Sequence, residues 1–360
     1  MKILTILGTR PEIIRLSLII RKLDLLAGKH IIVHTGQNFT YSLSDVFFKE
    51  LGIRNPDYVI SEKKQTVGEQ LSVMFREIEK VLIKEKPDKV LVLGDTNSAL
   101  GAVIAERLDI PVYHMEAGNR CFDWRVPEEK NRKIIDAVSS FNLPYTPKSR
   151  ENLMREGVPV QRIFVSGNPI YEVLSFYKEA IDNSNILNEC SLEKNNYFLA
   201  TIHRAENVDD PYHLKEIFEG LNQVADTFGK RMIVSIHPRT KSKLENRTDI
   251  RMSSKLEFYE PFGFFDFVSL EKNAFCVLTD SGTVQEECCI FHVPTVTVRK
   301  TTERPETVEC GSNIVSGLQS EPILRAVKVM AGQPASWVIP EGYDDPLVSD
   351  KVVKYLLGGR

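Results

Sequence analysis

The sequence predicts an α/β protein built from two doubly wound halves, in which helices cover both faces of each parallel sheet. The chain has 360 residues, about as many as two domains of ordinary size. Short runs dominated by apolar residues alternate with amphipathic helical patterns from end to end. Strands that are buried on both faces and separated by helices form βαβ units, and hence parallel sheets.

The predicted strands are, in chain order, Lys2–Leu7, His30–His34, Lys89–Leu93, Val112–His114, Phe198–Ile202, Met232–Ile236, Phe275–Leu278 and Thr295–Val298. Helical patterns such as Ile13–Leu26 and Gly68–Lys84 lie between them. The polar stretch Glu179–Asn196 precedes the second set of strands, and Asn168 lies at the seam before it. We therefore predict an N-terminal domain over 1–168 and a C-terminal domain over 169–348.

The composition is that of a globular protein without a strong charge of either sign. Hydrophobic residues make up 42% and charged residues 26%, and 46 Lys and Arg against 49 Asp and Glu leave a net charge of −3. A nucleic-acid-binding protein normally shows a basic excess, so we expect no nucleic-acid partner. No apolar stretch reaches the ~20 residues of a membrane span, and the run before Gly8 is too short for a signal peptide. We expect a cytoplasmic protein that has no membrane partner.

The cysteines predict neither disulfides nor a metal centre. The chain has 6 cysteines, and they are spread along it without a CxxC pair, which is the usual spacing of zinc ligands and redox pairs. We expect reduced, mostly structural thiols and no bound metal.

The loop after the first predicted strand reads Gly8-Thr9-Arg10-Pro11-Glu12. Thr9 and Glu12 have the spacing of a capping box, and Pro11 suits a first helical turn. Arg10 has no such structural explanation. Because a guanidinium at a helix N-terminus is well placed for an anion, we predict that Arg10 contacts a ligand, with Arg15 as a weaker second candidate. The loop is not a GxGxxG fingerprint, so a nicotinamide cofactor finds no support.

Three acidic side chains of the first half follow buried strands or begin a helix. Asp95 comes after the third predicted strand, Glu116 after the fourth, and Glu128 lies beside Glu129 in the first turn after a proline. Asp95 can also serve as a helix cap, and one of the Glu128–Glu129 pair can simply complement the helix dipole. A carboxylate after a buried strand is costly unless it is paired or reactive. Three carboxylates in one crevice would suit proton transfer, because crowded like charges raise a pKa towards neutrality.

Two histidines follow strands of the second half. His203 is followed by Arg204 after the first of these strands, and His237 comes after the second. A lone histidine is more often structural than catalytic, but a His-Arg pair at a strand end favours a functional role.

The turn Ser281-Gly282 lies between a predicted strand and a predicted helix. Such a turn builds an anion site from backbone N–H groups and a hydroxyl. Glu287 lies further into the helix, where it either accepts hydrogen bonds from a ribose or is a solvated surface residue. Arg304 lies in a charged loop, and as a bare charge cluster such a loop is more often solvated than functional.

These residues together resemble a known family, the non-hydrolysing UDP-N-acetylglucosamine 2-epimerases. The shared motifs are, in the family's order, GTRPE (8–12), TGQN (35–38), GDTNS (94–98), HMEAGNR (114–120), RVPEEKNR (125–132), HRAEN (203–207), HPRT (237–240), DSGTVQEE (280–287) and TERPE (302–306). They cover nearly the whole chain. The family has the GT-B architecture, two Rossmann-like domains that face a central ligand cleft. Its last helix, here within 349–360, usually crosses back to the first domain.

The resemblance implies inversion of carbon 2 of a UDP-N-acetylhexosamine without a metal, a nicotinamide or any other cofactor. A base removes the carbon-2 proton while UDP leaves, a 2-acetamidoglycal forms, and UDP then adds back. The catalytic residues that it implies are Asp95, Glu116, Glu128 and His203. The substrate-binding residues that it implies are Arg10, Arg15, Gln37, Arg132, His237, Ser281, Gly282, Glu287 and Arg304.

The segment from Asn119 to Glu129 looks most like a capsule and O-antigen subgroup of the family. Members of that subgroup convert UDP-2-acetamido-2,6-dideoxy-L-talose to UDP-N-acetyl-L-fucosamine, which would place the chain in cell-surface polysaccharide synthesis. Ala137 and Ser140 stand where the subgroup usually has His and Asp, and Arg15 stands where many relatives have Lys. The relatives are commonly dimers, so we expect a homodimer.

Three other functions share part of this pattern. A hydrolysing 2-epimerase, which releases UDP and the free sugar, would have the same motifs. A retaining GT-B glycosyltransferase would share the phosphate-binding residues but has no need of three acidic residues at strand ends. A non-catalytic nucleotide-sugar sensor would have inert residues at the titratable positions, whereas Asp95, Glu116, Glu128 and His203 are all present.

Overall fold

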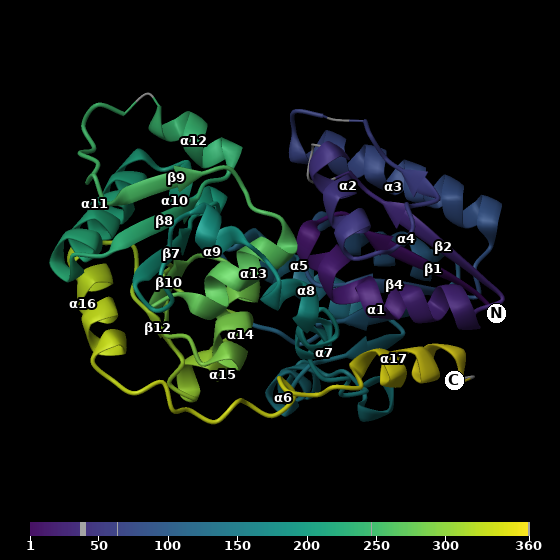
Figure 1. Cartoon of the computed structure of the whole chain (residues 1–360). Helices are drawn as coiled ribbons and strands as arrows, with labels where there is room; N and C mark the ends of the chain where they lie inside the picture. Colours follow the sequence, from purple (N-terminus) through teal and green to yellow (C-terminus); the bar gives the residue numbers. More distant parts are fainter. Residues whose placement is uncertain (37–40, 63, 246, 359–360) are drawn as a thin grey trace. The chain divides into compact units, whose positions relative to one another are not determined.

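The computed structural model describes residues 1–36, 41–62, 64–245 and 247–358 of the chain. They form two compact units, one made of Met1–Phe176 with Glu341–Arg360 and the other of Tyr177–Pro340 (Figure 1). Each unit contains a six-stranded sheet, and the paired strands are parallel. The predicted α/β fold class is confirmed. The division into domains at residue 168 stays a prediction, because compactness alone does not show where one folding domain ends.

The sheet of the first unit has the strand order β3-β2-β1-β4-β5-β6. Its strands are β1 (Lys2–Leu7), β2 (Lys29–His34), β3 (Tyr58–Val59), β4 (Lys89–Leu93), β5 (Val112–Met115) and β6 (Phe141–Leu143). The helices of this unit are α1 (Arg10–Leu26), α2 (Tyr41–Glu50), α3 (Val67–Glu85), η1 (Asn97–Leu100), α4 (Gly101–Arg107), α5 (Pro127–Val138), α6 (Pro147–Arg155), η2 (Val160–Arg162), α7 (Pro169–Phe176) and α17 (Val348–Leu357).

The sheet of the second unit has the strand order β12-β11-β10-β7-β8-β9. Its strands are β7 (Tyr197–Thr201), β8 (Arg231–Ser235), β9 (Leu256–Tyr259), β10 (Cys276–Thr279), β11 (Thr295–Thr297) and β12 (Asn313–Val315). The helices of this unit are α8 (Lys178–Asp182), α9 (Ile186–Glu189), α10 (Ala205–Val208), α11 (Pro211–Phe228), α12 (Pro238–Leu244), α13 (Phe264–Asn273), α14 (Gly282–Phe291), α15 (Pro305–Glu309) and α16 (Ser320–Ala331).

The strands that the sequence predicts are the inner ones. Each predicted strand is present, with its ends within one residue of the prediction. The strands not named from the sequence are β3, β6, β9 and β12, which form the outer edges of the two sheets. Edge strands are shorter and only partly buried, so they lack the continuous apolar run that marks an inner parallel strand.

The order of the strands reverses at one point in each sheet. In the first sheet the reversal lies between β1 and β4, and in the second it lies between β7 and β10. Ligands of open α/β sheets bind outside the carboxyl ends of the strands at such points. The loops that begin at Gly8 and Gly94 therefore meet at one reversal, and the loops that begin at Ile202 and Asp280 meet at the other.

The last helix belongs to the first unit, although it follows the whole second unit in the chain. In Figure 1, α17 (yellow) lies beside α1 (purple). The backbone N–H of Ser349 donates to the Glu172 carboxylate at 2.7 Å, and Lys89 Nζ donates to the Leu356 carbonyl at 2.7 Å. The ring of Tyr355 stacks on Phe164 with centroids 4.4 Å apart. These contacts tie the end of the chain to the first sheet.

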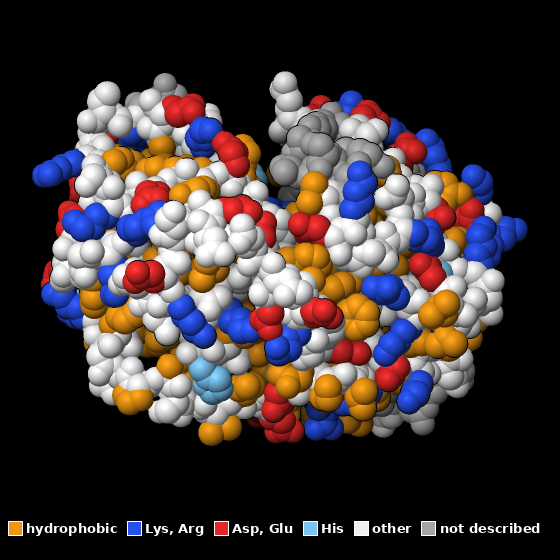
Figure 2. Space-filling view, viewed as in Figure 1, with side chains coloured by type: hydrophobic (Ala, Val, Ile, Leu, Met, Phe, Trp, Pro, Cys, Tyr) orange, Lys and Arg blue, Asp and Glu red, His pale blue; other side chains and the backbone are white. Residues whose placement is uncertain are grey.

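The surface mixes residue types. On the face shown in Figure 2, Lys and Arg side chains are interspersed with Asp and Glu side chains and with apolar ones, as the near balance of charges in the sequence leads one to expect. Among the described residues, no helix is long and apolar enough to cross a membrane.

Glu12 links two loops at the reversal point of the first sheet. Its carboxylate accepts hydrogen bonds from the backbone N–H groups of Gly8 and Thr9, at 2.5 and 3.0 Å, and from the hydroxyl of Thr96 in the loop after β4. The capping box predicted for Thr9 and Glu12 is therefore confirmed. Glu12 is only 2% exposed. Burial outweighs the hydrogen bonds and raises the pKa of its carboxyl group to about 7.

This pKa makes stability depend on pH. When a carboxyl group binds its proton more tightly in the folded state, the protein loses unfolding free energy as pH rises from the unfolded-state pKa to the folded-state pKa of that group. A rise from 4.5 to about 7 corresponds to roughly 3 kcal/mol at ~1.36 kcal/mol per pH unit. We expect wild type to lose about that much unfolding free energy relative to Glu12→Gln between pH 4.5 and pH 7, measured from urea midpoints. A difference between the two proteins that does not change over this range would contradict the assignment.

Candidate active site

Asp95 follows β4 and is held by a buried arginine of α5. Arg132 donates from Nε to Asp95 Oδ2 at 2.8 Å, and its Nη2 lies 2.6 Å from the same oxygen. On its other side, Arg132 Nη1 donates to Glu129 at 2.7 Å. The Asp95 carbonyl accepts a hydrogen bond from the Asn131 side chain at 2.9 Å. Asp95 stays partly exposed while Arg132 is 2% exposed, so the carboxylate is fixed in direction and still accessible.

Glu129 is the structural member of the Glu128–Glu129 pair. It accepts hydrogen bonds from the backbone N–H groups of Cys121 and Phe122 at 3.0 and 3.1 Å, in addition to that from Arg132. Burial alone would raise the pKa of Glu129, but these donors lower it below its usual value. Glu128 lies in the same first turn of α5 and is half-buried. The sequence left open which of the two has a structural role, and the structure gives that role to Glu129, which holds the loop at Cys121 and Phe122.

Glu116 follows β5 and pairs with Arg15 of α1. Arg15 Nη1 donates to Glu116 Oε2, and the two residues are 2% and 6% exposed. The backbone of Glu116 is left-handed, with a φ of 66°, which is uncommon for a residue with a side chain and occurs often at functional sites. The structure thus gives Arg15 a carboxylate partner from the predicted catalytic set.

A buried layer of charged residues lies beneath these loops, and the sequence did not reveal it. His114 lies in β5, with Nε2 2.8 Å from the Gly94 carbonyl and Nδ1 2.8 Å from Asp136. Asp136 also accepts from the Gly118 N–H at 3.1 Å and pairs with Arg120 at 2.7 Å. This network holds the backbone on both sides of the predicted carboxylates. The only signal of this network in the sequence is the polar residue His114 in the otherwise apolar strand β5, because Asp136 lies in a helix that is rich in polar residues.

Arg10 and Gln37 complete the predictions for the first unit. Arg10 begins α1, and its guanidinium lies 5.7 Å from the centre of the Phe47 ring. Burial lowers its pKa, and in the described part of the chain no carboxylate forms an ion pair with it. A buried guanidinium without an ion-paired carboxylate is what we expect of a residue that binds an anionic ligand. Gln37 lies outside the described residues.

Asp280 organises the loop after β7 in the second unit. This carboxylate is fully buried. It accepts from the backbone N–H groups of His203 and Arg204 at 3.0 and 2.9 Å and from the Asn207 side chain at 3.0 Å. It also lies 3.2 Å from His203 Nδ1. The imidazole of His203 is therefore oriented by a buried acid, an arrangement typical of functional histidines.

The N-terminus of α14 and the loop before α15 together form a site suited to an anion. Gly282 begins the helix, and a Cβ built on it would lie 2.6 Å from Glu303 Oε1. A side chain at this position would therefore require the Glu303 carboxylate to shift. Arg304 is 4% exposed, and its Nε lies 2.5 Å from Glu286 Oε1. Ser281 is the N-cap, and its side chain does not cap the helix, so the first N–H groups of α14 are not taken up by it at a place where an anion is favoured.

A second arginine joins this group through Glu303. Arg204 Nη2 lies 3.3 Å from Glu303 Oε1, and Arg299 Nη1 donates to Glu303 Oε2 at 2.7 Å. The guanidinium of Arg204 also donates to the Asp280 carbonyl at 2.9 Å. Arg204 also lies 3.7 Å from Glu206 Oε1, so the arginines of this group are each paired with a glutamate and offer a ligand directed N–H groups.

The remaining predicted residues have different settings. His237 caps α12 and accepts from the Arg239 N–H at 3.2 Å, while its ring lies 6.4 Å from that of His203. Glu287 is 3% exposed, which excludes the solvated-surface interpretation. It lies within hydrogen-bond reach of Glu271 of α13.

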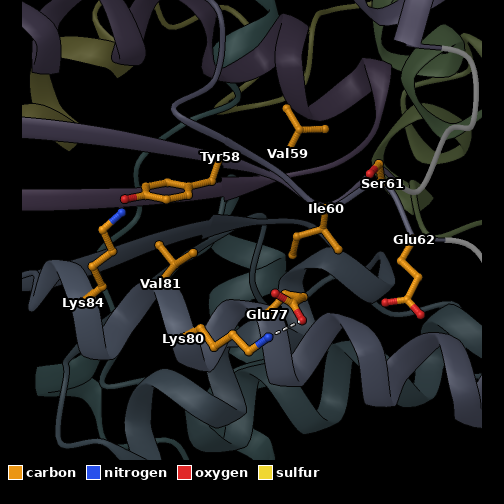
Figure 3. A pocket seen from close by; sticks show the side chains of 9 residues that line it. All are labelled: Tyr58, Val59, Ile60, Ser61, Glu62, Glu77, Lys80, Val81 and Lys84. Atoms are coloured by element: carbon orange, nitrogen blue, oxygen red, sulfur yellow. Dashed lines mark hydrogen bonds and ion pairs between the residues drawn. The ribbon is translucent and has the colours of Figure 1, made fainter.

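The cavity shown in Figure 3 lies apart from all these residues. It has a volume of about 440 Å³ and lies between β3 and α3, with Tyr58, Ile60, Val81 and Lys84 among its lining. The Glu77 and Lys80 side chains at its rim pair at 2.8 Å. None of the predicted site residues lines it, and it has no arrangement of groups suited to acid–base chemistry. Among the described residues, no group of three or more His, Cys, Asp and Glu side chains is arranged to hold a metal ion.

Comparison with known proteins identifies the family of the chain and agrees with its fold. The family model of UDP-N-acetylglucosamine 2-epimerase matches residues 24–357. The UDP-N-acetylglucosamine 2-epimerase of Methanocaldococcus jannaschii is 45% identical over 368 positions, covering 100% of both chains. Its crystal structure in complex with UDP-GlcNAc and UDP superposes with a TM-score of 0.93 at 43% identity, again over 100% of both chains. A UDP-2,3-diacetamido-2,3-dideoxy-D-glucuronate 2-epimerase of Pseudomonas aeruginosa is 37% identical over 99% of each chain.

One expectation is corrected by these relatives. The segment from Asn119 to Glu129 suggested the L-fucosamine subgroup, but the similar proteins named above are epimerases of UDP-N-acetylglucosamine and of a diacetamido uronate. In the structure, Cys121, Phe122 and Glu129 of that segment hold one another through hydrogen bonds. A resemblance in this segment reflects the shape of a loop, and enzymes that act on different sugars can share that shape. The expected isomerase activity is confirmed, and the chain belongs to the UDP-N-acetylglucosamine 2-epimerase family.

Proposed function

We propose that the chain is a non-hydrolysing epimerase that inverts carbon 2 of UDP-N-acetylglucosamine, with UDP leaving and adding back. The observation that carries this proposal is Asp95, a partly exposed carboxylate at a sheet reversal point that Arg132 holds in direction. UDP-N-acetylglucosamine is the sugar nucleotide named for the M. jannaschii relative. The L-talose substrate has only a loop resemblance in its favour.

The first unit supplies groups for moving the carbon-2 proton. Asp95 follows β4, Glu116 follows β5, and Glu128 lies in the first turn of α5. In a parallel sheet the carboxyl ends of adjacent strands, such as β4 and β5, lie at the same edge. Inversion needs one group that removes a proton from one face and another that returns a proton to the opposite face. Carboxyl groups in different electrostatic settings can divide these tasks. Glu116 beside Arg15 and Asp95 beside Arg132 provide two such settings.

The second unit supplies groups for holding UDP when its bond to the sugar breaks. The leaving diphosphate develops negative charge, and fixed donors at a helix N-terminus stabilise it without reorganisation. Ser281 and Gly282 at the start of α14, together with Arg304, offer such donors. His203, oriented by Asp280, offers a further one. Retaining UDP is what separates an epimerase from a hydrolase of the same substrate.

The reaction products distinguish an epimerase that retains UDP from an enzyme that hydrolyses the same substrate. Incubation with UDP-N-acetylglucosamine followed by anion-exchange chromatography is expected to give UDP-N-acetylmannosamine at equilibrium with the substrate. The same run with added chelator is expected to give the same mixture. Free UDP together with a reducing sugar as the main products would move the chain to the hydrolysing class.

Asp95→Asn is expected to lower turnover ~10²–10⁴-fold, the usual contribution of a proton-transfer group. UDP affinity measured by calorimetry should stay within a few-fold of wild type. The variant should fold, because the amide oxygen still accepts from Arg132 and Arg132 keeps its bond to Glu129. Asp109→Asn is the matched control, since Asp109 is exposed and has a left-handed φ of 58° that Asn adopts readily. Turnover by Asp95→Asn equal to that of the control would remove Asp95 from the mechanism.

Arg304→Lys is expected to weaken UDP binding about tenfold or more, because an ammonium group lacks the planar pair of donors that fits a phosphate. Lysine keeps a positive charge near the buried Glu286, so the fold is retained better than with alanine. The conservative control is Arg325→Lys on the exposed face of α16. Calorimetry with UDP measures both, and equal affinity in the two variants would show that Arg304 serves the fold alone.

A further inference from the structure

Glu271 is a buried acid for which the proposed mechanism has no use. It lies near the end of α13 and is fully buried. Neither of its carboxyl oxygens accepts a hydrogen bond from a donor in the described part of the chain. Its side chain instead lies within hydrogen-bond reach of another carboxyl group, that of Glu287 on α14. An ionised carboxylate without donors is very costly in a protein interior.

Among the described residues, the charged group that acts on the Glu271 carboxyl group is another acid, Glu287. Helix α8 also packs against α13, but Lys178 of α8 and Lys272 of α13 both pair with Asp182. The adjacent Leu270, with Val284 and Cys288 of α14, belongs to the apolar core of this unit. The titratable groups that act on Glu271 from the neighbouring elements are Glu287 and Cys288 of α14 and Tyr197 of β7. The Tyr197 hydroxyl is already used, since it donates to the Leu270 carbonyl at 2.6 Å. Burial raises the pKa values of both Cys288 and Tyr197, so these two groups are neutral.

Two adjacent buried carboxyl groups cannot both ionise, so the pair keeps one proton. Burial and the neighbouring Glu287 raise the pKa of Glu271 well above its usual value. Because neither oxygen of Glu271 has, among the described residues, a donor that could stabilise a negative charge, Glu271 is the member that holds the proton, and its O–H donates to the Glu287 carboxylate. Glu287 keeps its negative charge and its remaining lone pairs, and the hydrogen bond from Glu271 contributes to fixing the direction in which they point.

We propose that Glu271 is a positioning residue for the nucleotide, because its protonated carboxyl group orients Glu287 to accept hydrogen bonds from the ribose hydroxyls. This inference rests on the proposed function, in which Glu287 is the ribose contact. It adds Glu271 of α13 to the nucleotide site as a second acid beside Glu287 of α14. It requires Glu271 to stay neutral at the pH at which the enzyme is active. Glutamine, which is neutral and has an N–H donor, is then the natural substitute for Glu271, whereas leucine is not.

The ribose contact is measured by the ratio of the calorimetric affinities for UDP and 2′-deoxy-UDP. Wild type is expected to prefer UDP about tenfold, as the loss of one hydrogen bond to a charged acceptor implies. Glu271→Gln should keep this preference, and Glu271→Leu should reduce it to within about threefold. Glu321→Gln, an exposed change on α16, is the control. Full preference in a folded Glu271→Leu, or equal loss in the Gln and Leu variants, would overturn the proposal.

The pH dependence gives a second test that needs no leucine variant. The preference of wild type for UDP should fall at alkaline pH, where the shared proton is lost and Glu287 loses its donor. In Glu271→Gln the preference should stay constant over the same range, because an amide does not titrate. Identical pH profiles in the two proteins would contradict the shared proton.

Glu287→Gln separates this inference from the proposed function. If that variant keeps the wild-type preference for UDP over 2′-deoxy-UDP, then Glu287 is not the ribose contact, and the assignment within the proposed function fails. If it loses the preference while Glu271→Leu keeps it, the ribose contact stands and only the role of Glu271 is lost.

Discussion

The pairing of buried arginines with carboxylates at the ends of parallel strands is the constraint on which the first unit depends. Parallel strands direct their carboxyl ends to one edge, so polar loops gather there. Arg132 lies between Asp95 and Glu129, and Arg15 lies against Glu116. A buried ion pair contributes little net stability, but removing one partner is strongly destabilising. The pairs therefore fix the direction of each carboxylate, which is what a proton transfer needs.

The second unit has the same kind of sheet topology as the first, but the loops at its reversal point carry different groups. Its reversal point joins the loop after β7 to the start of α14, and Asp280 holds that loop through backbone N–H groups. Its arginines are paired with buried glutamates, as Arg304 with Glu286 and Arg204 with Glu303 illustrate. The candidate acid–base carboxylates thus lie in the first unit and the candidate helix N-terminus for a diphosphate in the second, which suits a reaction that moves a proton and releases a diphosphate.

The inner strands, the capping box at Thr9 and the placement of polar residues after strands could be predicted from the sequence, because burial on both faces leaves a continuous apolar run and caps have fixed spacings. The edge strands could not, since their burial is decided by tertiary neighbours. The candidate site residues were predicted from residue type, position and family resemblance, but the partners that the structure gives them were not. That Arg15 meets Glu116, and that Glu129 instead of Glu128 holds the loop at Cys121, depends on contacts between residues far apart in the chain. The Glu271–Glu287 pair was invisible for the same reason.

The central claim is that carbon 2 loses and regains its proton while UDP is retained. Proton NMR of the purified protein with UDP-N-acetylglucosamine in heavy water tests it most directly. The account predicts that deuterium appears at carbon 2 of sugar nucleotides that still carry UDP, in both epimers. Inversion without deuterium at carbon 2, or tight UDP binding with no exchange at all, would contradict it.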